Sequence, residues 1–326
     1  MSGTPKTIRR LVAGAVIAST TLLRPGASKA LESVTFTTDF GYNGRHAYFF
    51  VALDRGYYRD AGLEVRIVRG QGDSQIGAGN AMFGFADPGN VILARANDRI
   101  PVKLVAIVYC KPPQAIFCRE DSGLTKPKDL EGNAIGTTAG ASVPTLFPAF
   151  AKAAGIDVRT VRWVLASIES LPGLLATNKV SCVGQFTVGE ALLRSQYGPG
   201  KLVRFAYSDA GLSYFGSGIV ATDATIASKP DLVSRFVAAT ISGMKDAFAN
   251  PEAAGAIMHK IVPLVDATVA KKETEAVAEL VQIPRQRLGE IDPGRMEATI
   301  DVVKRAFQLA TPVAAADVYA PGFVPK

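Results

Sequence analysis

The chain has 326 residues, of which 48% are hydrophobic and 20% are charged, and its formal net charge is +7. This composition supports a large folded core and excludes a disordered tail, a collagen-like repeat and a small disulfide-stapled protein. An excess of positive charge is compatible with a nucleic-acid or acidic-membrane partner, so its position along the chain decides its meaning.

Residues 1–30 have the composition of a secretory signal peptide. Three basic residues precede a largely apolar run over 11–23, and small residues at Ser28 and Ala30 offer a cleavage site. The apolar run is too short to cross a membrane. We therefore predict export and cleavage after Ala30, and the sequence leaves open whether the Sec or the twin-arginine route is used.

The same segment carries most of the net charge. Five of the 36 basic residues and none of the 29 acidic residues lie in it, so the rest of the chain has a net charge of about +2. No later block of basic residues resembles a nucleic-acid footprint, and no later apolar run is long enough for a membrane-spanning helix. We therefore expect no nucleic-acid partner.

The chain contains three cysteines and two histidines, and their spacing suits no zinc site. Cys110 and Cys118 flank a Lys-Pro-Pro turn and could face each other across it, but spacing does not establish a disulfide. Cys182 follows a strand-like segment and is most simply a buried apolar residue. We expect no metal and no cofactor.

Strand and helix patterns alternate along the chain after residue 30. Period-two alternation predicts strands over 34–38 and 63–68. Short apolar or strand-like runs predict further strands over 82–85, 102–109, 133–138, 161–165, 180–183, 202–205 and 218–222. Apolar residues at helical spacing predict helices over 46–55, 73–80, 90–96, 127–132, 140–154, 171–177, 230–248, from 251, over 267–281 and over 296–309. Such alternation predicts an α/β fold with mainly parallel sheets and helices on their faces.

Two α/β architectures fit this order: one large doubly wound domain, or two lobes joined by crossings near 110–120 and 208–218. We favour the two-lobed form, in which 31–115 and 216–326 make the first lobe and 116–215 the second. Ligands of open α/β sheets bind at the carboxyl ends of the strands. Two such sheets would direct their loops at one shared cleft.

Loops after the strands supply the candidate ligand contacts. The loop over 39–46 combines a carboxylate, two aromatic rings, an amide and an imidazole, a set that can stack a planar ligand or form an ordinary turn. The loop over 137–142 precedes a helix and offers free N–H groups to an anion or a carbonyl oxygen, unless its hydroxyls only cap that helix. The candidate ligand-binding residues are Asp39, Phe40, Tyr42, Asn43, His46, Asp87, Asn90, Thr138, Gly140, Ala141, Ser142, Gln185, Tyr214 and Phe215.

Five segments in a fixed order resemble one protein family. Residues 38–46 form an aromatic-and-amide loop, and residues 52–65 read A-x-x-x-G-Y-Y-x-x-x-G-L-x-V. Residues 126–136 resemble the start of a second lobe, and 229–233 and 250–254 resemble closing helices. Together they resemble the periplasmic substrate-binding proteins of ABC importers. The branch is the one related to thiamine-pyrimidine synthases and shared with sulfonate, taurine and nitrate binders.

The resemblance implies a type II periplasmic binding-protein fold with two hinge crossings and a ligand cleft between the lobes. It also implies a periplasmic location, a small-molecule ligand and an ABC transporter permease as partner, and we expect a monomer. The aromatic loop favours a thiamine-type pyrimidine precursor as ligand. A sulfonate, taurine, nitrate or aromatic acid in the same architecture stays open.

The synthases of that branch are enzymes, and this chain lacks the groups on which they depend. They use a lysine and a histidine where this chain has Ala86 and Asn90, and a cysteine-rich iron loop where 212–217 contains no cysteine. Without these groups the synthase reaction cannot proceed, because the reacting amine, the imidazole and the metal-binding thiolates are missing. The sequence also contains no G-x-S-x-G or H-E-x-x-H motif. We therefore predict a binding protein and not an enzyme, with a pyrimidine-synthase-like enzyme as the alternative of another class.

Overall fold

The protein is described from a computed structural model, which covers residues 1–3, 30–71, 81–198, 200–281, 286–307 and 309–326. Residues 31–326 form one compact unit. Most of the predicted signal peptide and the predicted helix over 73–80 lie outside the described residues.

The first of two five-stranded sheets is built from distant parts of the chain. Its strands are β1 (Glu32–Thr37), β3 (Leu63–Val68), β5 (Phe83–Ala86), β6 (Val102–Ile107) and β12 (Gly218–Thr222). They lie in the order β3-β1-β5-β12-β6, with β1 parallel to β3 and β5, and β12 antiparallel to β5 and β6. A strand from late in the chain therefore separates two strands from early in it.

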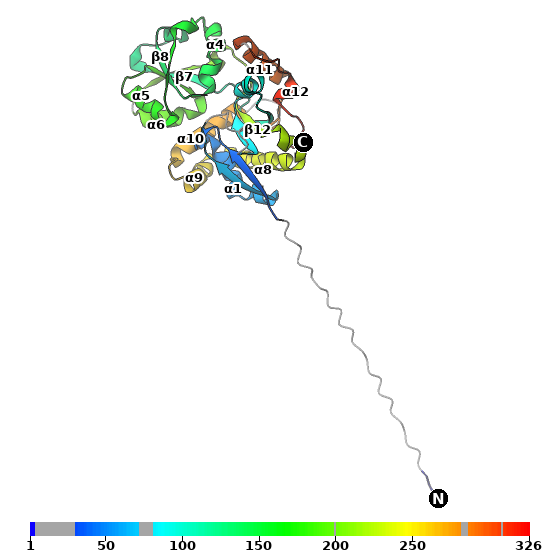
Figure 1. The fold of residues 1–326 in the computed structure, drawn as a ribbon. Helices are drawn as coiled ribbons and strands as arrows, with labels where there is room; N and C mark the ends of the chain where they lie inside the picture. The colour runs from blue at the N-terminus through cyan, green and yellow to red at the C-terminus, as the bar shows by residue number, and fades with distance from the viewer. Residues whose placement is uncertain (4–29, 72–80, 199, 282–285, 308) are drawn as a thin grey trace. The chain divides into compact units, whose positions relative to one another are not determined.

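The second sheet is built from one continuous stretch. Its strands are β7 (Gln114–Arg119), β8 (Ala134–Thr137), β9 (Arg162–Leu165), β10 (Cys182–Phe186) and β11 (Leu202–Ala206). They lie in the order β11-β7-β10-β8-β9, and only β7 runs antiparallel to its neighbours. We call this sheet and its helices the second lobe (114–206), and the first sheet and its helices the first lobe. Figure 1 shows the elements of the second lobe in green.

Helices cover both sheets. The α-helices are α1 (Ala47–Asp54), α2 (Tyr57–Asp60), α3 (Pro88–Leu93), α4 (Ser142–Ala154), α5 (Leu171–Ala176), α6 (Glu190–Tyr197), α7 (Asp223–Ser228), α8 (Pro230–Ala249), α9 (Pro251–Ile261), α10 (Ala267–Val281), α11 (Pro293–Ala306) and α12 (Ala315–Val318). Shorter elements are the ribbon of β2 (Phe40–Gly41) and β4 (Gly70–Gln71) and the π-helix η3 (Ala94–Asp98). The 3₁₀ helices are η1 (Gly44–His46), η4 (Glu120–Ser122), η5 (Pro127–Leu130), η6 (Val158–Thr160), η7 (Ile168–Ser170), η8 (Thr187–Gly189) and η9 (Tyr207–Ala210).

Local sequence explains several helix ends. The Asn250 side chain accepts a hydrogen bond from the N–H of Ala253 at 3.0 Å, and Pro251 occupies the first turn of α9. The C-terminal end of α4 is also explained locally, because the helix ends where Gly155 adopts a left-handed φ of +69°. These are the signals from which the sequence predicted the same helices.

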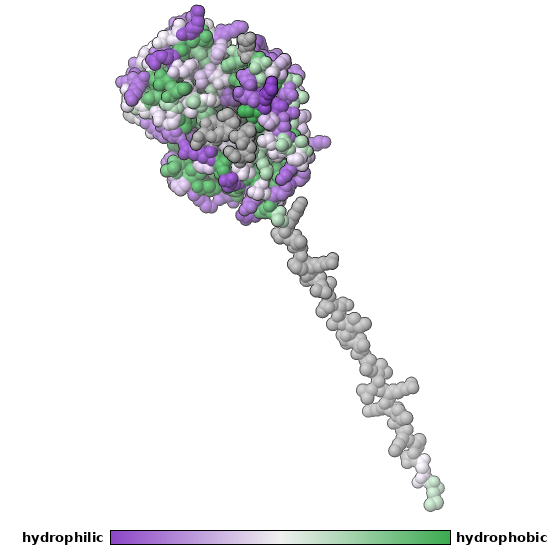
Figure 2. Space-filling model, in the orientation of Figure 1, coloured by the Kyte–Doolittle hydropathy of each residue, from purple (hydrophilic) through white to green (hydrophobic). Residues whose placement is uncertain are grey.

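Aromatic side chains join α8 to the first sheet. Phe236 of α8 stacks on Phe83 of β5, with ring centroids 4.2 Å apart, and on Tyr58 of α2, with centroids 5.3 Å apart. All three rings are buried. On the face seen in Figure 2, polar residues in purple surround smaller groups of apolar residues in green. In the described part of the chain, no helix combines the length and apolar character needed to cross a membrane.

Two local predictions need correction, and a third is refined. The short helix predicted over 127–132 is the 3₁₀ helix η5, which ends at Leu130. Ser228 followed by Pro230 is a sequence pattern that predicts a helix cap, but Ser228 ends α7 and does not cap α8. Gln185 and Phe186 are the last residues of β10, whereas the sequence placed them after the strand. The hydrophobic run over 180–183 did not reveal that the strand continues, because Gln185 and its glycine neighbour are not strand-like residues.

The disulfide joins a different pair from the one considered in the sequence. Cys118 is bonded to Cys182, and Cys110 is a free, buried thiol. Cys118 and Cys182 lie directly opposite each other on the neighbouring antiparallel strands β7 and β10, with Cα atoms 4.0 Å apart. The alternative of a Cys110–Cys118 pair is therefore wrong, as is the reading of Cys182 as an unpaired apolar residue.

Candidate functional site

The loop after β1 is held tightly against α10. The Thr38 hydroxyl donates to the carbonyl oxygen of Gly41 at 2.7 Å, and the side-chain amide of Asn43 donates to the carbonyl oxygen of Phe40 at 2.6 Å. Gly44 packs so closely on α10 that a Cβ there would lie 2.3 Å from the Cα of Ala270. Only glycine permits this approach, so the glycine fixes where the loop lies.

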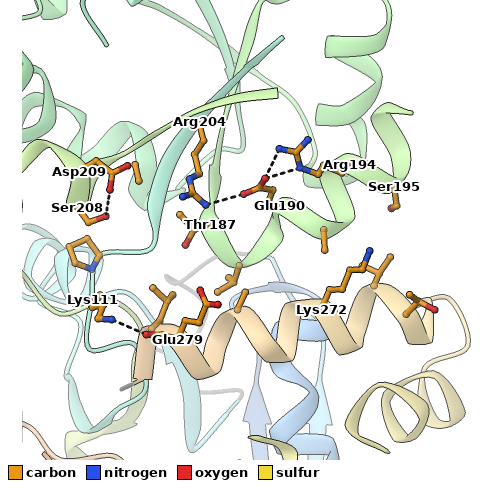
Figure 3. A pocket seen from close by; sticks show the side chains of 18 of the residues that line it. Lys111, Thr187, Glu190, Arg194, Ser195, Arg204, Ser208, Asp209, Lys272 and Glu279 are labelled. Carbon is orange, nitrogen blue, oxygen red and sulfur yellow. Dashed lines mark hydrogen bonds and ion pairs between the residues drawn. The ribbon is translucent and has the colours of Figure 1, made fainter. Parts of the chain in front are cut away.

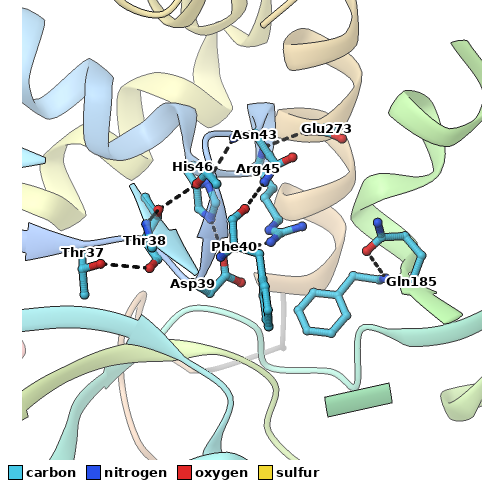
Figure 4. A network of polar contacts seen from close by, with 12 residues as sticks. Thr37, Thr38, Asp39, Phe40, Asn43, Arg45, His46, Gln185 and Glu273 are labelled. Carbon is cyan, nitrogen blue, oxygen red and sulfur yellow. Dashed lines mark hydrogen bonds and ion pairs between the residues drawn. The ribbon is translucent and has the colours of Figure 1, made fainter. Parts of the chain in front are cut away.

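Asp39, Arg45 and His46 form a buried ionic network in this loop (Figure 4). The Asp39 carboxylate accepts hydrogen bonds from the Arg45 guanidinium at 2.9 Å and from Nε2 of His46 at 2.8 Å. Nδ1 of His46 accepts from the backbone N–H of Asn43 at 3.3 Å, which leaves the proton on Nε2. A neutral imidazole therefore faces Asp39.

The charges of the network follow from burial and pairing. Burial by itself would raise the pKa of Asp39, but the charge of Arg45 and the hydrogen bonds from Arg45 and His46 outweigh it and hold that pKa well below its usual range. Burial lowers the pKa of His46, although Asp39 opposes the shift. Asp39 and Arg45 are thus a compensated ion pair at neutral pH.

Glu273 of α10 adds a second carboxylate to the same loop. It is buried, and its Oε2 accepts a hydrogen bond from the backbone N–H of Arg45 at 3.0 Å. Burial raises the pKa of Glu273 to about 7, despite the nearby charge of Arg45 and the backbone N–H groups of Arg45 and Gly44. This glutamate joins the loop of residues 38–46 to a helix more than 200 residues away in the sequence.

The raised pKa makes a prediction about stability. Because the pKa of Glu273 in the folded protein, about 7, exceeds its ordinary value of 4.5, the folded state loses stability as the pH rises between these two values. We expect Glu273→Gln to gain stability relative to the wild type on going from pH 4.5 to pH 8, by on the order of 3 kcal/mol. Urea unfolding at the two pH values measures this.

The matched control for that variant is Glu275→Gln, on the same helix but exposed. It should change stability by the same small amount at both pH values. A Glu273→Gln difference that did not depend on pH would show that the carboxylate is not held in the protonated form by burial.

A small cavity lies between the lobes at the ends of β1, β8 and β10. It has a volume of about 20 Å³, enough for one water molecule, and Phe40, Arg45, Thr138 and Phe186 are among its lining residues. The Arg45 guanidinium lies 5.5 Å from the centroid of the Phe186 ring, a cation–π contact between the two lobes. Figure 4 shows Arg45 beside the ring of Phe40, with Gln185 on the far side.

Two buried polar atoms among these lining residues have no hydrogen-bond partner. They are Nε of Arg45, which is a donor, and the hydroxyl of Thr138, which can donate or accept. The Arg45 side chain is only 2% exposed, so water does not replace the missing partner freely. Such atoms are suited to hydrogen-bonding a ligand that separates the lobes slightly.

A larger cavity of about 270 Å³ adjoins the first one, since Phe40 and Ile168 line both. Tyr42, Asn43 and Glu273 line it from the first lobe. An ion pair between Arg69 of the first lobe and Glu169 of the second crosses its rim, and both side chains are more than half exposed. The two cavities together offer space for a molecule with one or two rings.

A second buried network joins the lobes near the crossings. Nε2 of Gln114 donates to Asp87 at 2.8 Å and to the Ser142 hydroxyl at 2.9 Å, and its Oε1 accepts from the Tyr214 hydroxyl at 3.0 Å. Asp87 also caps α3 by accepting from the N–H of Gly89 at 2.8 Å. Burial raises the pKa of Asp87 to about 6, although hydrogen bonds from Gly89, Gln114 and Ser142 oppose the shift.

The most voluminous of the described cavities is an open groove of about 1000 Å³ between α6 and α10. Figure 3 shows Lys272 and Glu279 projecting from α10 towards the opposite wall, where Glu190 pairs with Arg194 and Arg204. The charged groups of that wall are thus paired with one another. The groove is lined by fewer aromatic side chains than the cavities around Phe40.

Apart from Phe215, the predicted residues fall into three groups: those that line the two adjoining cavities, those in the two buried networks, and the pair Asn90 and Gly140. Phe40, Thr138, Ala141, Ser142 and Gln185 line the small cavity, and Tyr42 and Asn43 line the adjoining one. Asp39 bonds Arg45 and His46 and does not line the small cavity itself. Asp87 and Tyr214 belong to the Gln114 network. The amide of Asn90 donates to the carbonyl oxygen of Gly140 at 3.1 Å, across the lobes.

Phe215 belongs to none of these groups. Its ring is buried beneath the Arg295 guanidinium, which lies 4.5 Å from the ring centroid, and Phe215 lines none of the three cavities described. The sequence in turn did not propose Arg45, Gln114 or Glu273. The sequence pattern could have indicated that Glu273 is buried, because this glutamate lies on the apolar face of a predicted helix, between Ala270 and Val277.

Comparison with known proteins identifies the family. The family model described as NMT1/THI5 like matches residues 43–254. The chain belongs to the NMT1/THI5-like family. Among its relatives, the riboflavin-binding protein RibY of Chloroflexus aurantiacus is 25% identical over 315 residues, covering 92% of this chain and 88% of that protein. The formylaminopyrimidine-binding protein of Halalkalibacterium halodurans is 24% identical over 324 residues, covering 96% and 97%.

A solved structure supports the fold of this NMT1/THI5-like protein. The alkanesulfonate-binding protein SsuA from Xanthomonas axonopodis pv. citri, bound to MOPS, matches with a TM-score of 0.72 over 89% of this chain and 98% of that chain. The sequences are 14% identical, so the likeness shows the fold alone. The predicted two-lobed periplasmic binding-protein fold and the predicted family are confirmed.

Proposed function

We propose that this NMT1/THI5-like protein is an exported solute receptor that captures a small planar heteroaromatic molecule between its lobes and delivers it to an ABC transporter permease. The best candidate is a pyrimidine of the thiamine-precursor type. The observation that carries the proposal is the pair of unpartnered buried atoms, Nε of Arg45 and the hydroxyl of Thr138, among aromatic rings of both lobes.

The charge of the site favours a neutral ligand over an anion. Arg45 is already paired with Asp39, and Arg69 with Glu169, so neither cation near the cavities is without a carboxylate. Glu273 lines the larger cavity as a further acid. A sulfonate or nitrate would have to approach these carboxylates, whereas a neutral ring with nitrogen acceptors and an amino group can bond Arg45 and Thr138 without added charge.

Two relatives agree with this ligand class, since one is named for riboflavin and the other for formylaminopyrimidine. Both names denote planar nitrogen heterocycles. The same relatives are named as binding proteins, which supports binding without turnover. The sequence pattern of residues 1–30 supports export.

Calorimetry with a defined panel tests the proposal. The panel consists of 4-amino-5-hydroxymethyl-2-methylpyrimidine, formylaminopyrimidine, riboflavin, benzoate, taurine, an alkanesulfonate and nitrate. We expect at least one heteroaromatic compound to bind and the sulfonates and nitrate not to bind. Binding of a sulfonate alone would favour the alternative that the protein is a sulfonate receptor. Binding of no compound in the panel would contradict the proposal. Native mass spectrometry of protein taken from the host periplasm would identify a retained ligand and would show whether residues 1–30 are present.

One substitution tests where the ligand binds. Phe40 lines both cavities, and stacking of a ring on an aromatic side chain contributes about 1–3 kcal/mol. We therefore expect Phe40→Ala to weaken binding of the heteroaromatic ligand by about tenfold or more. Calorimetry measures the change.

The control is Phe323→Ala, a half-buried aromatic residue of the C-terminal segment. It should leave the affinity unchanged. Equal affinity in the wild type and the Phe40→Ala variant would place the ligand elsewhere.

A further inference from the structure

Contacts between the lobes differ greatly in burial. The Arg69–Glu169 ion pair is more than half exposed on both sides, and the bond from Asn90 to Gly140 is also exposed. The two hydrogen bonds that Gln114 donates, to Asp87 and Ser142, are fully buried. Through these two bonds one buried side chain joins groups of both lobes. Exposed pairs are weakened by water and salt, whereas buried bonds to a carboxylate are not.

The position of Gln114 lets it act on both lobes at once. It is the first residue of β7, directly after the first crossing, and it is 0% exposed. Asp87 begins α3 of the first lobe, Ser142 begins α4 of the second, and Tyr214 lies in the second crossing. One amide therefore bonds a residue of each lobe and a residue of the second crossing.

The orientation of the amide is fixed by its surroundings. Asp87 accepts hydrogen bonds from the N–H of Gly89 and from Ser142 as well as from Gln114, so the group that faces it must be the NH₂ of the amide. The Tyr214 hydroxyl then donates to the remaining Oε1. Reversing the amide would place an oxygen against the carboxylate, and two acceptors would face each other unsatisfied.

We propose that Gln114 is the positioning residue that holds the lobes closed, because its buried amide bonds Asp87 of the first lobe and Ser142 of the second at the same time, with Tyr214 fixing the orientation of the amide. Opening the cleft breaks at least one of these bonds. The network thus sets the balance between open and closed forms before any ligand is present, and with it the affinity for a ligand that binds the closed form. In this respect the inference rests on the proposed function.

The test measures the distance between lobes in ligand-free protein. Spin labels are attached at Arg59→Cys in the first lobe and Lys179→Cys in the second, both exposed positions. Cys110 is buried and Cys118 and Cys182 are bonded, so the native cysteines do not compete for the label. In the parent protein we expect a single distance between the labels, the one that corresponds to the closed form. Gln114→Met, which keeps the volume but removes the amide, should raise the ratio of open to closed molecules by about tenfold or more.

Two further variants and one control make the test independent of folding defects. Ser142→Ala removes the bonds that Ser142 makes with Gln114 and with Asp87, and Tyr214→Phe removes only the bond to Oε1 of Gln114. Both should shift the distances in the same direction as Gln114→Met, and Tyr214→Phe by less. Thr240→Val removes a buried hydrogen bond of similar kind, between Thr240 and Tyr58 at 2.9 Å inside the first lobe, and should not shift them. Circular dichroism confirms that each variant is folded.

Several outcomes would overturn the inference. They are an open parent protein, unchanged distances in both Gln114→Met and Ser142→Ala, and an equal shift in Thr240→Val. None of them depends on a ligand, so a failure here is separate from a failure of the calorimetry that tests the proposed function.

Discussion

Arg45→Met is expected to lower the free energy of unfolding by about 3–5 kcal/mol at neutral pH, because it leaves a buried carboxylate without its partner. Arg45 and Asp39 are each only 2% exposed, and Nη2 of Arg45 lies 2.9 Å from Oδ1 of Asp39. Breaking such a pair from one side is far more harmful than replacing both partners. Urea unfolding at pH 7 measures the loss.

The pH dependence of this variant has a definite sign. In the wild type the pKa of Asp39 is held below its ordinary value, so its stabilising contribution is present above about pH 4 and is lost as the pH falls further. In the variant, Asp39 is destabilising while ionised, and protonation relieves it. The difference in free energy of unfolding between the wild type and Arg45→Met should therefore be largest at neutral pH and should become smaller in acid.

The control is Arg159→Met, which removes an arginine that is 86% exposed and paired with Asp157. An exposed pair of this kind contributes about 0–1 kcal/mol. If Arg45→Met were as mild as Arg159→Met, the ion pair between Arg45 and Asp39 would not be an integral part of the loop.

Reduction of the disulfide should have a comparably large effect. Cys118 and Cys182 are 64 residues apart in the sequence. Closing a loop of that length in the unfolded chain corresponds to roughly 4 kcal/mol in the chain-entropy account, and native disulfides typically contribute 2–5 kcal/mol. We expect Cys118→Ala/Cys182→Ala to lower the free energy of unfolding by about 2–5 kcal/mol. Adding dithiothreitol to the wild type should lower it by the same amount, and urea unfolding measures both.

Thiol counting after denaturation provides the control. The wild type has three cysteines in all, and the bond leaves one free thiol, at Cys110. Reductant should raise the count to three. Cys110→Ala should change stability much less, since only packing is lost. A full count of three thiols in the untreated protein, or an unchanged midpoint after reduction, would contradict the pairing.

Local patterns were sufficient to predict most of the elements. The strand over 63–68 was predicted with the bounds of β3, because charged and apolar residues alternate through it. The end of α4 followed from Gly155, whose left-handed φ allows the chain to turn. Features of this kind depend on neighbours a few residues away, so one sequence is enough to recognise them.

The pairings at the site depend on distant parts of the chain. Arg45 and Glu273 are 228 residues apart, and Gln114 meets Tyr214 across 100 residues. No periodicity indicates which buried glutamate will contact which loop. The strand β7 was also not predicted, because its first residues follow two prolines and lie where a turn between Cys110 and Cys118 was considered. The loop over 39–46 was recognised by composition alone, which is why Arg45 was present in it but not assigned.

The discontinuous order of the first sheet has a consequence for the time course of folding. The second lobe occupies residues 114–206 without interruption, so all its strands are available once that stretch has been synthesised. The first sheet has to wait for β12, and the loop around Arg45 has to wait for Glu273. Contacts between such distant residues form slowly, and domains tend to fold as units. The first lobe is therefore the later of the two to be completed, and the loop around Arg45 reaches its final structure only after α10 has been added.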